Sequence, residues 1–365
     1  MRLALQLAGK AEGWTSPNPM VGAVIVKDGR IIGQGYHQRA GAAHAEVVAL
    51  RQAGAQARGA TLYVTLEPCN HTGRTPPCCG AILAAGVSRV IVAARDPNRI
   101  TNGRGIARLR RAGVHVLVGA LEREARALNE PFEKAVKTGL PLVIAKVGQS
   151  LDGKIATVSG ESRWITSSAS RRIAHDWRRR VDAILVGVNT VLQDDPALTV
   201  RGLAHRPDRP IRVIVDSRLR APASAACFSG GSRASALIAT TVQEEARHRA
   251  WTRRGVEVLA LPARQGRVPL GPLCRALVRR GVHSVLIEGG SELLAGAFAE
   301  RLVDRIVFFI APVLIGGRDA PSALGGEGIR SLRRAIRLEG VVSRRVGEDL
   351  CVEAHVVYPT FASRK

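Results

Sequence analysis

The feature that most constrains the fold is an alternation of short apolar runs with segments of helical periodicity, which continues along nearly the whole chain. An apolar-periodic N-terminal segment precedes two β-rich runs that flank the tight-turn signal Lys27-Asp28-Gly29, which predicts a helix and then a hairpin. Helix-like and strand-like segments then alternate as far as residues 122–139, where we predict one helix that ends at Gly139. The pattern predicts an α/β domain of two or three layers with a mixed sheet.

A second series of strand-like runs begins after this helix. Its members are "PLVIAKVGQSLDG", "DAILVGV", "IRVIVD", "ASALIAT", "VEVLAL", "HSVLIEGG", "RIVFFIAPVLIG" and "LCVEAHVVY". Continuous apolar strands between helical segments predict a mostly parallel sheet that is covered on both faces. Because 365 residues suit two domains better than one, we place a boundary near residue 145 and expect domains at 1–145 and 146–365.

Arginine gives the chain a formal net charge of +24. Nucleic acid is one partner that such a charge could attract. The basic residues, however, recur along the whole chain, and the aromatic residues that would stack on unpaired bases make up only 4%. A solvated arginine-rich surface is therefore favoured over a nucleic-acid face, and phosphorylated small substrates would be served by the same positive field.

Cysteine usage and the N-terminus indicate the compartment. Six cysteines in a chain of this length do not form the dense framework of a disulfide-stapled secreted domain. The N-terminus lacks a cleavage pattern, and no segment approaches the roughly 18 apolar residues of a membrane span. We expect a cytoplasmic protein without a membrane partner.

One His, one Glu and two Cys in the first half form a metal-binding pattern. His44-Ala45-Glu46 opens a helix-like segment, and Pro68-Cys69 closes a strand 25 residues after His44. A His-x-Glu followed by Pro-Cys and a further Cys is the signature of zinc deaminases. One imidazole and two thiolates leave the fourth tetrahedral position of zinc open for a water. Glu46 could take the proton of that water and deliver it to the leaving ammonia.

The second thiolate is displaced from its usual spacing, because eight residues separate Cys69 from Cys78. Cys78 follows two prolines and begins a helix-like segment, where the helix dipole favours a thiolate. Cys79 points elsewhere on that helix and is expected to pack, serving as a ligand only if Cys78 does not. Between the two ligands lie His71 and Arg74, a titratable donor and a fixed cation that would suit substrate recognition.

Long motifs carry a family resemblance. The segments "SPNPMVGAVIVKDG", "GYHQRAGAAHAEVVAL", "VTLEPCNHTGRTPPCC", "SLDGKIATVSGESRWITS" and "VLQDDPALTVR" resemble the bifunctional riboflavin-biosynthesis enzymes. Those enzymes join a diaminohydroxyphosphoribosylaminopyrimidine deaminase to a 5-amino-6-(5-phosphoribosylamino)uracil reductase. The resemblance covers nearly the whole chain, and it implies a cytidine-deaminase-like α/β domain followed by a dihydrofolate-reductase-like α/β domain, in a homo-oligomer.

The resemblance also implies roles in the first half. Glu46 would be the proton shuttle, with His44, Cys69 and Cys78 as zinc ligands. Asn18, His71 and Arg74 would hold the pyrimidine and its ribose phosphate. For Asn18 a plain turn role is a close alternative, because Asn before Pro favours turns.

The second half contains no GxGxxG and no Walker loop. In "VLIEGGSELLAGAF" a buried strand ends at Glu288 before two glycines and a helix, which is either a phosphate-binding junction or an ordinary turn. The resemblance favours NADPH binding. It implies that NADPH lies near Gly148, Trp164, Thr190, Asp194, Ser217, Gly290, Ser291, Glu292, Leu293 and Leu294. It implies that the phosphorylated substrate lies near Ser162, Arg178, Leu198, Arg201 and Glu288, where Arg178 and Arg201 could clamp a phosphate. Lys146 and Lys154 are either further substrate contacts or surface lysines.

Two other functions compete with this bifunctional one. A zinc deaminase acting on tRNA or single strands would use the same metal motif and would explain the charge, but it would not explain "SLDGK", "GESRWITS" or "DDPALTVR". A zinc-stabilised structural module is disfavoured, because Glu46 and the three-ligand count indicate an open coordination position.

Overall fold

A computed structural model of the chain describes residues 1–72, 76–229 and 235–359. The chain divides into two compact units, Met1–Leu140 and Pro141–Lys365. The boundary expected near residue 145 falls inside strand β6 (Leu142–Ser150), which begins the sheet of the second unit. No helix among the described residues is both long and apolar enough to cross a membrane.

Within the described residues, the first unit is built on a five-stranded mixed sheet in the order β2-β1-β3-β4-β5. β1 is antiparallel to both β2 and β3, whereas β3, β4 and β5 are parallel. Asp28 and Gly29 both have positive φ and form the tight turn predicted between β1 and β2. The strands are β1 (Gly22–Lys27), β2 (Arg30–Tyr36), β3 (Thr61–Leu66), β4 (Arg89–Ala94) and β5 (His115–Val118).

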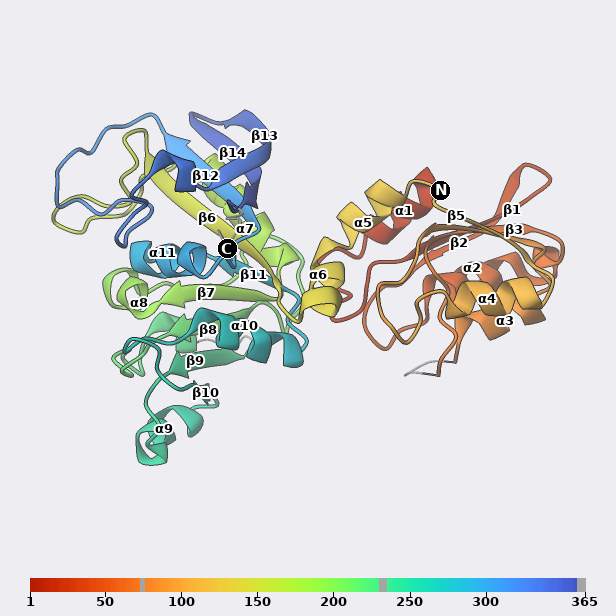
Figure 1. Cartoon of the computed structure of the whole chain (residues 1–365), viewed down its shortest axis with the longest axis horizontal. Helices are drawn as coiled ribbons and strands as arrows, with labels where there is room; N and C mark the ends of the chain where they lie inside the picture. Colours follow the sequence, from red (N-terminus) through yellow and green to blue (C-terminus); the bar gives the residue numbers. More distant parts are fainter. Residues whose placement is uncertain (73–75, 230–234, 360–365) are drawn as a thin grey trace, which may run out of the picture. The chain divides into compact units, whose positions relative to one another are not determined.

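Helices cover both faces of this sheet, so the unit has three layers (Figure 1). Apolar residues of α2, α3 and α4 share one core with the strands, and those of α1 and α5 pack on the opposite side. The helices are α1 (Arg2–Gly9), α2 (Ala45–Ala53), η1 (Gly54–Ala57), α3 (Cys78–Ala84), α4 (Arg104–Arg111), α5 (Glu122–Leu128) and α6 (Glu130–Thr138).

The single helix predicted over 122–139 is wrong, because the chain forms two helices that meet at Asn129. The side chain of Asn129 is buried and pairs with the backbone of Met20: its Oδ1 accepts the Met20 N–H (2.7 Å), and its Nδ2 donates to the Met20 carbonyl (2.9 Å). Pro131 then lies in the first turn of α6, where its missing N–H costs nothing. The helix ends as predicted, with Gly139 in the left-handed conformation.

Within its own described residues, the second unit contains a nine-stranded sheet in the order β10-β9-β8-β7-β11-β6-β12-β14-β13. The strands from β10 to β12 are mutually parallel, while β14 and β13 are antiparallel additions at one edge. This agrees with the predicted mostly parallel sheet. The strands not yet bounded are β7 (Ala183–Gly187), β8 (Ile211–Val215), β9 (Ala236–Thr240), β10 (Glu257–Ala260), β11 (Ser284–Ile287), β12 (Arg305–Ala311), β13 (Arg337–Val346) and β14 (Asp349–Val357).

Helices α7, α8 and α9 contribute to one large core with this sheet, whereas α10 and α11 bury separate sets of apolar residues. Figure 1 shows these helices around the sheet in green to blue. The helices are α7 (Ser168–Arg180), α8 (Val188–Asp194), η2 (Ala226–Phe228), α9 (Glu245–Thr252), α10 (Leu270–Arg279), α11 (Ser291–Ala299) and η3 (Leu332–Arg334).

Candidate functional site

Three side chains from separate segments of the first unit converge on one point. His44 is the N-cap of α2, Cys69 follows β3, and Cys78 is the first residue of α3. Their ligand atoms all lie within 4.8 Å of one another. His44 Nδ1 is 3.1 Å from the Cys78 sulfur and 3.6 Å from the Cys69 sulfur. One nitrogen and two sulfurs form a donor set that zinc prefers, and three ligands leave its fourth position open.

The two candidate thiolate ligands are electrostatically coupled. A hydrogen bond from the Cys78 thiol lowers the pKa of the Cys69 thiol to about 4 despite its partial burial, with His44 adding to the effect. The Cys78 backbone N–H also donates to the Cys69 sulfur (3.3 Å). The same sharing, together with burial, raises the pKa of the Cys78 thiol. A metal cation that replaced the shared proton would allow both sulfurs to be thiolates.

Cys79 is set apart from this cluster by one step along α3. Its sulfur lies 3.5 Å from the Pro68 carbonyl and 3.6 Å from the Gly105 carbonyl. Burial raises the pKa of its thiol to about 12. Cys79 is thus a protonated packing residue in this structure, as the sequence predicts.

Glu46 lies in the first turn of α2 and is buried beside the cluster, only 3% exposed. Burial raises the pKa of its carboxyl, although its own backbone N–H and His44 act in the opposite direction. A carboxyl with a raised pKa is suited to accept and return a proton near neutral pH.

A second histidine, His37, adjoins the cluster and was missed in the sequence. Its ring contacts the His44 ring edge to face, with centroids 5.4 Å apart. Burial lowers the pKa of His37, so the neutral ring donates from Nδ1 to the Ala43 carbonyl (3.2 Å) and accepts at Nε2 from the Asn18 side-chain amide (3.0 Å). Asn18 also closes a backbone turn with Thr15, which agrees with the turn alternative, whereas substrate binding by Asn18 stays a prediction. The sequence signal that could have identified His37 is its position directly after a predicted strand.

The segment between the two cysteines is described only in part. His71 is exposed, and its Nδ1 lies 3.5 Å from the hydroxyl of the buried Thr101. Arg74 lies outside the described residues. The structure therefore brings His71 to the loop that precedes α4, which the sequence did not connect with it.

In the second unit, the predicted residues gather where neighbouring parallel strands end. Gly148 is near the end of β6, Glu288 follows β11, Thr190 follows β7 in α8, and Ser217 follows β8. These four strands are adjacent in the sheet, in the order β8-β7-β11-β6. The carboxyl edge of a parallel sheet is where α/β proteins bind their ligands.

Glu288 and Arg178 form a buried, bidentate ion pair at this edge. Arg178 Nε and Nη2 donate to the two Glu288 oxygens over 2.6 and 2.8 Å, and Nη1 donates to the Thr199 carbonyl over 2.9 Å. Lys146 Nζ lies 3.5 Å from Glu288. The guanidinium face that we expected to clamp a phosphate is therefore occupied by Glu288. Lys146 is half-buried at the site, while Lys154 donates to the Ala320 carbonyl (2.9 Å).

A glycine turn links further predicted residues at this edge. Gly289 and Gly290 have φ of 150° and 86°, and a Cβ on Gly289 would lie 3.2 Å from Thr190 Oγ1. This close turn opens directly onto the N-terminus of α11, which contains Ser291, Glu292, Leu293 and Leu294. Unencumbered backbone at a helix N-terminus suits a phosphate of a dinucleotide, so the residues present fit NADPH.

Ser162, Trp164 and Asp194 lie together. The Ser162 hydroxyl donates to Asp194 Oδ1 over 2.6 Å, and Arg163 donates to the Asp194 carbonyl. Trp164 is 70% exposed, with the Arg171 guanidinium 4.5 Å above its ring. An exposed indole that carries a cation offers a flat surface to a ligand.

The remaining predicted residues, Arg201, Leu198 and Ser217, form no hydrogen bond or ion pair with the Glu288–Arg178 pair in the described part of the chain. The Arg201 backbone N–H donates to His175 Nδ1 (3.3 Å), and burial lowers the pKa of His175, with Arg178 adding to the effect. His175 is a neighbour of the ion pair that the sequence did not reveal. Leu198 is buried in the hydrophobic core. The Ser217 hydroxyl accepts the Val268 N–H (3.1 Å).

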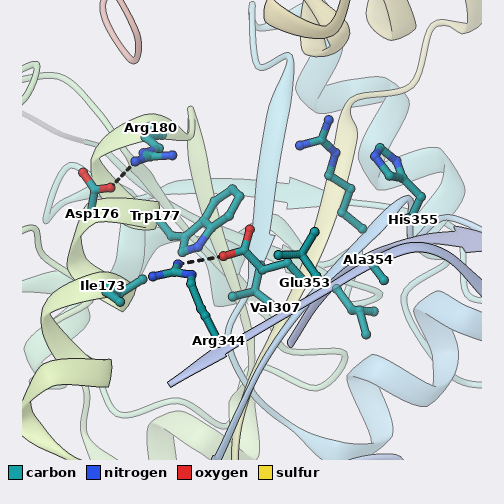
Figure 2. Close-up of a pocket in the computed structure, with 13 residues that line it drawn as sticks. Ile173, Asp176, Trp177, Arg180, Val307, Arg344, Glu353, Ala354 and His355 are labelled. Carbon is teal, nitrogen blue, oxygen red and sulfur yellow. Dashed lines mark hydrogen bonds and ion pairs between the residues drawn. The ribbon is translucent and has the colours of Figure 1, made fainter. Parts of the chain in front are cut away.

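A separate cavity of about 520 Å³ lies between α7 and the strands β12, β13 and β14 (Figure 2). Two ion pairs lie within its wall, since Arg344 binds Glu353 (2.9 Å) and Arg180 binds Asp176. None of the predicted site residues lines it.

Two family models match the chain. The cytidine and deoxycytidylate deaminase zinc-binding region matches residues 1–94. The RibD C-terminal domain matches residues 141–352. The two matches agree with the two units of the structure and with the position of the metal cluster in the first.

Full-length relatives are similar along nearly the whole chain. Riboflavin biosynthesis protein RibD of Aquifex aeolicus is 45% identical over 352 residues, covering 96% of each chain. RibD of Escherichia coli is 44% identical, covering 96% of this chain and 97% of its own. Among solved structures, Acinetobacter baumannii RibD superposes with a TM-score of 0.88 at 38% identity, covering 98% of this chain and 97% of its own. The Thermotoga maritima diaminohydroxyphosphoribosylaminopyrimidine deaminase/5-amino-6-(5-phosphoribosylamino)uracil reductase gives 0.85 at 34% identity, with the same coverage.

Proposed function

This chain belongs to the RibD family of bifunctional riboflavin-biosynthesis enzymes, which join a zinc-dependent deaminase to an NADPH-dependent reductase, and from this we propose its substrates and the roles of its residues. The first unit deaminates 2,5-diamino-6-(5-phosphoribosylamino)pyrimidin-4(3H)-one. The second reduces the ribosyl chain of the product to a ribityl chain, giving 5-amino-6-(5-phosphoribitylamino)uracil. The observation that carries the proposal is the convergence of His44, Cys69 and Cys78 beside the buried Glu46.

In the deaminase half, His44, Cys69 and Cys78 would hold zinc, which when bound acidifies a water at its open position. Glu46 takes a proton at its carboxylate and returns it to the amino group that leaves as ammonia. The raised pKa of the Glu46 carboxyl, caused by burial, supports this role. Asn18, His71 and Arg74 bind the substrate. His37 holds the Asn18 amide and packs against the His44 ring.

In the reductase half, NADPH when bound would supply the hydride for reduction at C1′ of the ribosyl chain. The glycine turn before α11, together with Gly148, Trp164, Thr190, Asp194 and Ser217, would bind the cofactor. The substrate lies near Ser162, Leu198, Arg201 and the Glu288–Arg178 pair. In this arrangement Arg178 acts by holding Glu288 ionised and in place, and Lys146, which lies 3.5 Å from Glu288, reaches the substrate from the same cluster.

The compartment and the assembly are parts of the same proposal. A cytoplasmic location is supported by the six cysteines, which all lie in the described ranges and form no disulfide. A homo-oligomer is supported by β13, an edge strand that pairs only with β14 among the described residues and on which Leu338, Val341 and Val342 are 42%, 56% and 59% exposed. A monomer mass for the zinc-loaded protein in sedimentation equilibrium would contradict the oligomer.

The deciding assay supplies the zinc-loaded protein with NADPH and the diaminopyrimidine ribotide and follows ammonia release together with NADPH oxidation. We expect Glu46→Gln to keep zinc and to lose ammonia release by a factor of about 10² to 10⁴, because the proton shuttle is gone. The same variant should still oxidise NADPH when the deaminated intermediate is supplied. No ammonia from the wild type would refute the deaminase, and zinc loss in Glu46→Gln would make Glu46 a ligand.

A further inference from the structure

Glu67 is a buried carboxylate that the mechanism above does not use. It follows β3 directly, two residues before Cys69, and is 4% exposed. Its Oε2 accepts the N–H of Gly103 (2.9 Å) and of Asp96 (3.4 Å), and its Oε1 accepts the N–H of Gly105 (3.0 Å) and of Ile106 (3.2 Å). Every one of these donors is 29 or more residues away along the chain. Both oxygens are therefore used only as acceptors.

Three of these donors, Gly103, Gly105 and Ile106, belong to the N-terminus of α4, where unpaired N–H groups and the helix dipole favour a negative charge. Gly103 is the N-cap of this helix, which has no cap from its own side chain. Glu67 thus replaces a local cap with one from a distant part of the chain. The consequence is that α4 is fastened to the chain immediately before Cys69.

The same helix holds both flanks of Cys69. On one side, a Cβ on Gly105 would lie only 2.0 Å from the Pro68 carbonyl oxygen, so the two backbones are in direct contact. On the other side, Arg108 Nη1 donates to Asn70 Oδ1 over 2.7 Å. The residues before and after Cys69 are therefore both fixed by α4, which is fixed by Glu67.

Glu67 also orders the loop that faces His71. Its contact with the Asp96 N–H holds the start of this loop, and its contact with Gly103 holds the end. Between them, the buried Thr101 places its hydroxyl 3.5 Å from His71 Nδ1. One carboxylate therefore connects the metal-binding side and the substrate-binding side of the site.

We propose that Glu67 is a positioning residue of the deaminase: acting through α4 and the 96–103 loop, it fixes the Cys69 sulfur for the metal and His71 for the substrate. The inference rests on the proposed function, because it takes Cys69 as a zinc ligand. Groups that support metal ligands in this way commonly change metal affinity 10- to 100-fold when they are removed.

The sharpest probe is Glu67→Gln, which keeps the size of the side chain but turns one acceptor oxygen into an NH₂ donor. Each Glu67 oxygen accepts two N–H groups, so the new NH₂ group faces two N–H donors in either orientation of the amide. Two of the four hydrogen bonds are therefore lost. Glu122→Gln is the matched control, because it makes the same chemical change on a side chain of the same unit that is 42% exposed.

The experiment uses the full chain. Zinc affinity is measured by competition with a chromophoric chelator, and cobalt(II) is substituted to record the sulfur-to-metal absorption. Deamination is then compared with reduction of separately supplied deaminated intermediate. For Glu67→Gln we expect zinc binding weakened about 10- to 100-fold, a changed cobalt spectrum and a higher KM for deamination, with reduction unchanged. Glu122→Gln should match the wild type in all four measurements.

Unchanged zinc affinity and an unchanged cobalt spectrum in Glu67→Gln would overturn the inference, and so would an equal loss of both activities, which indicates general destabilisation. If Glu67→Gln does not fold, Asn70→Ala removes the Arg108 contact without emptying a buried site, and it must also weaken zinc binding. A wild type that binds no zinc would instead refute the proposed function, so the two failures are distinguishable.

Discussion

At the scale of single residues, the buried pair of Glu288 and Arg178 shows how the surroundings decide a side chain's role. Burial alone would raise the pKa of Glu288, but the Arg178 guanidinium and then the Lys146 ammonium outweigh it and lower that pKa to about 2. The family resemblance implied that both residues lie near the substrate. It could not show that they bind each other, because they are 110 positions apart and Arg178 was equally plausible as a partner of a phosphate.

This pair predicts a pH-dependent stability of the second unit. The pKa of Glu288 is lower in the folded state than the roughly 4.3 of an exposed Glu. Its contribution is therefore complete above about pH 4.3 and is lost as the pH falls toward about 2. Glu288→Gln leaves the Arg178 charge buried without its partner, and we expect a loss of roughly 3–5 kcal/mol in unfolding free energy at pH 7. Urea unfolding at several pH values should show that the difference in unfolding free energy between the wild type and Glu288→Gln becomes smaller below pH 4. A difference that does not change with pH would contradict the lowered pKa of Glu288.

At the scale of helices and strands, Asn129 connects the junction of α5 and α6 to the segment that precedes β1. Its side-chain amide forms two hydrogen bonds with the Met20 backbone just before β1. Asn129→Ala would leave the half-buried N–H and carbonyl of Met20 without these bonds, and we expect it to lower the free energy of unfolding by about 1–2 kcal/mol. Chemical denaturation of the deaminase unit measures this loss. Asn102→Ala, at an exposed position, is the control and should stay within about 0.5 kcal/mol of the wild type; equal effects would show that the Met20 contact is unimportant.

The same scale shows where sequence patterns succeed and where they stop. Strands buried on both faces were predicted because they are continuous apolar runs. β13 was missed because nearly all of its residues are exposed, so it has no alternation to detect. The helix predicted over 122–139 breaks at Asn129, whose side chain bonds to the backbone of the distant Met20. His44, Cys69 and Cys78 were predicted from a local pattern, whereas Glu67 and His37 act through partners that only the folded chain brings near.

At the scale of the whole molecule, the two units have separate sheets and separate hydrophobic cores. In the part of the chain that the structure describes, the one cluster able to hold a metal lies in the first unit. We therefore expect a strong chelator to abolish ammonia release while NADPH oxidation with the deaminated intermediate is retained. Adding zinc should restore the first activity. Loss of both activities on chelation would show that the metal also supports the reductase unit.

The close contact between the two ends of the segment from Cys69 to Cys78 has a consequence for how such a site can change during evolution. Cys69 and α3 are joined by the Cys78 N–H to the Cys69 sulfur (3.3 Å) and by the Cys79 N–H to the Cys69 carbonyl (3.2 Å). With its ends held together, doubling the length of the intervening chain adds only about 0.6 kcal/mol of closure entropy. New recognition residues can thus be inserted between two metal ligands at little thermodynamic cost, which allows substrate choice to diverge while the metal chemistry is inherited unchanged.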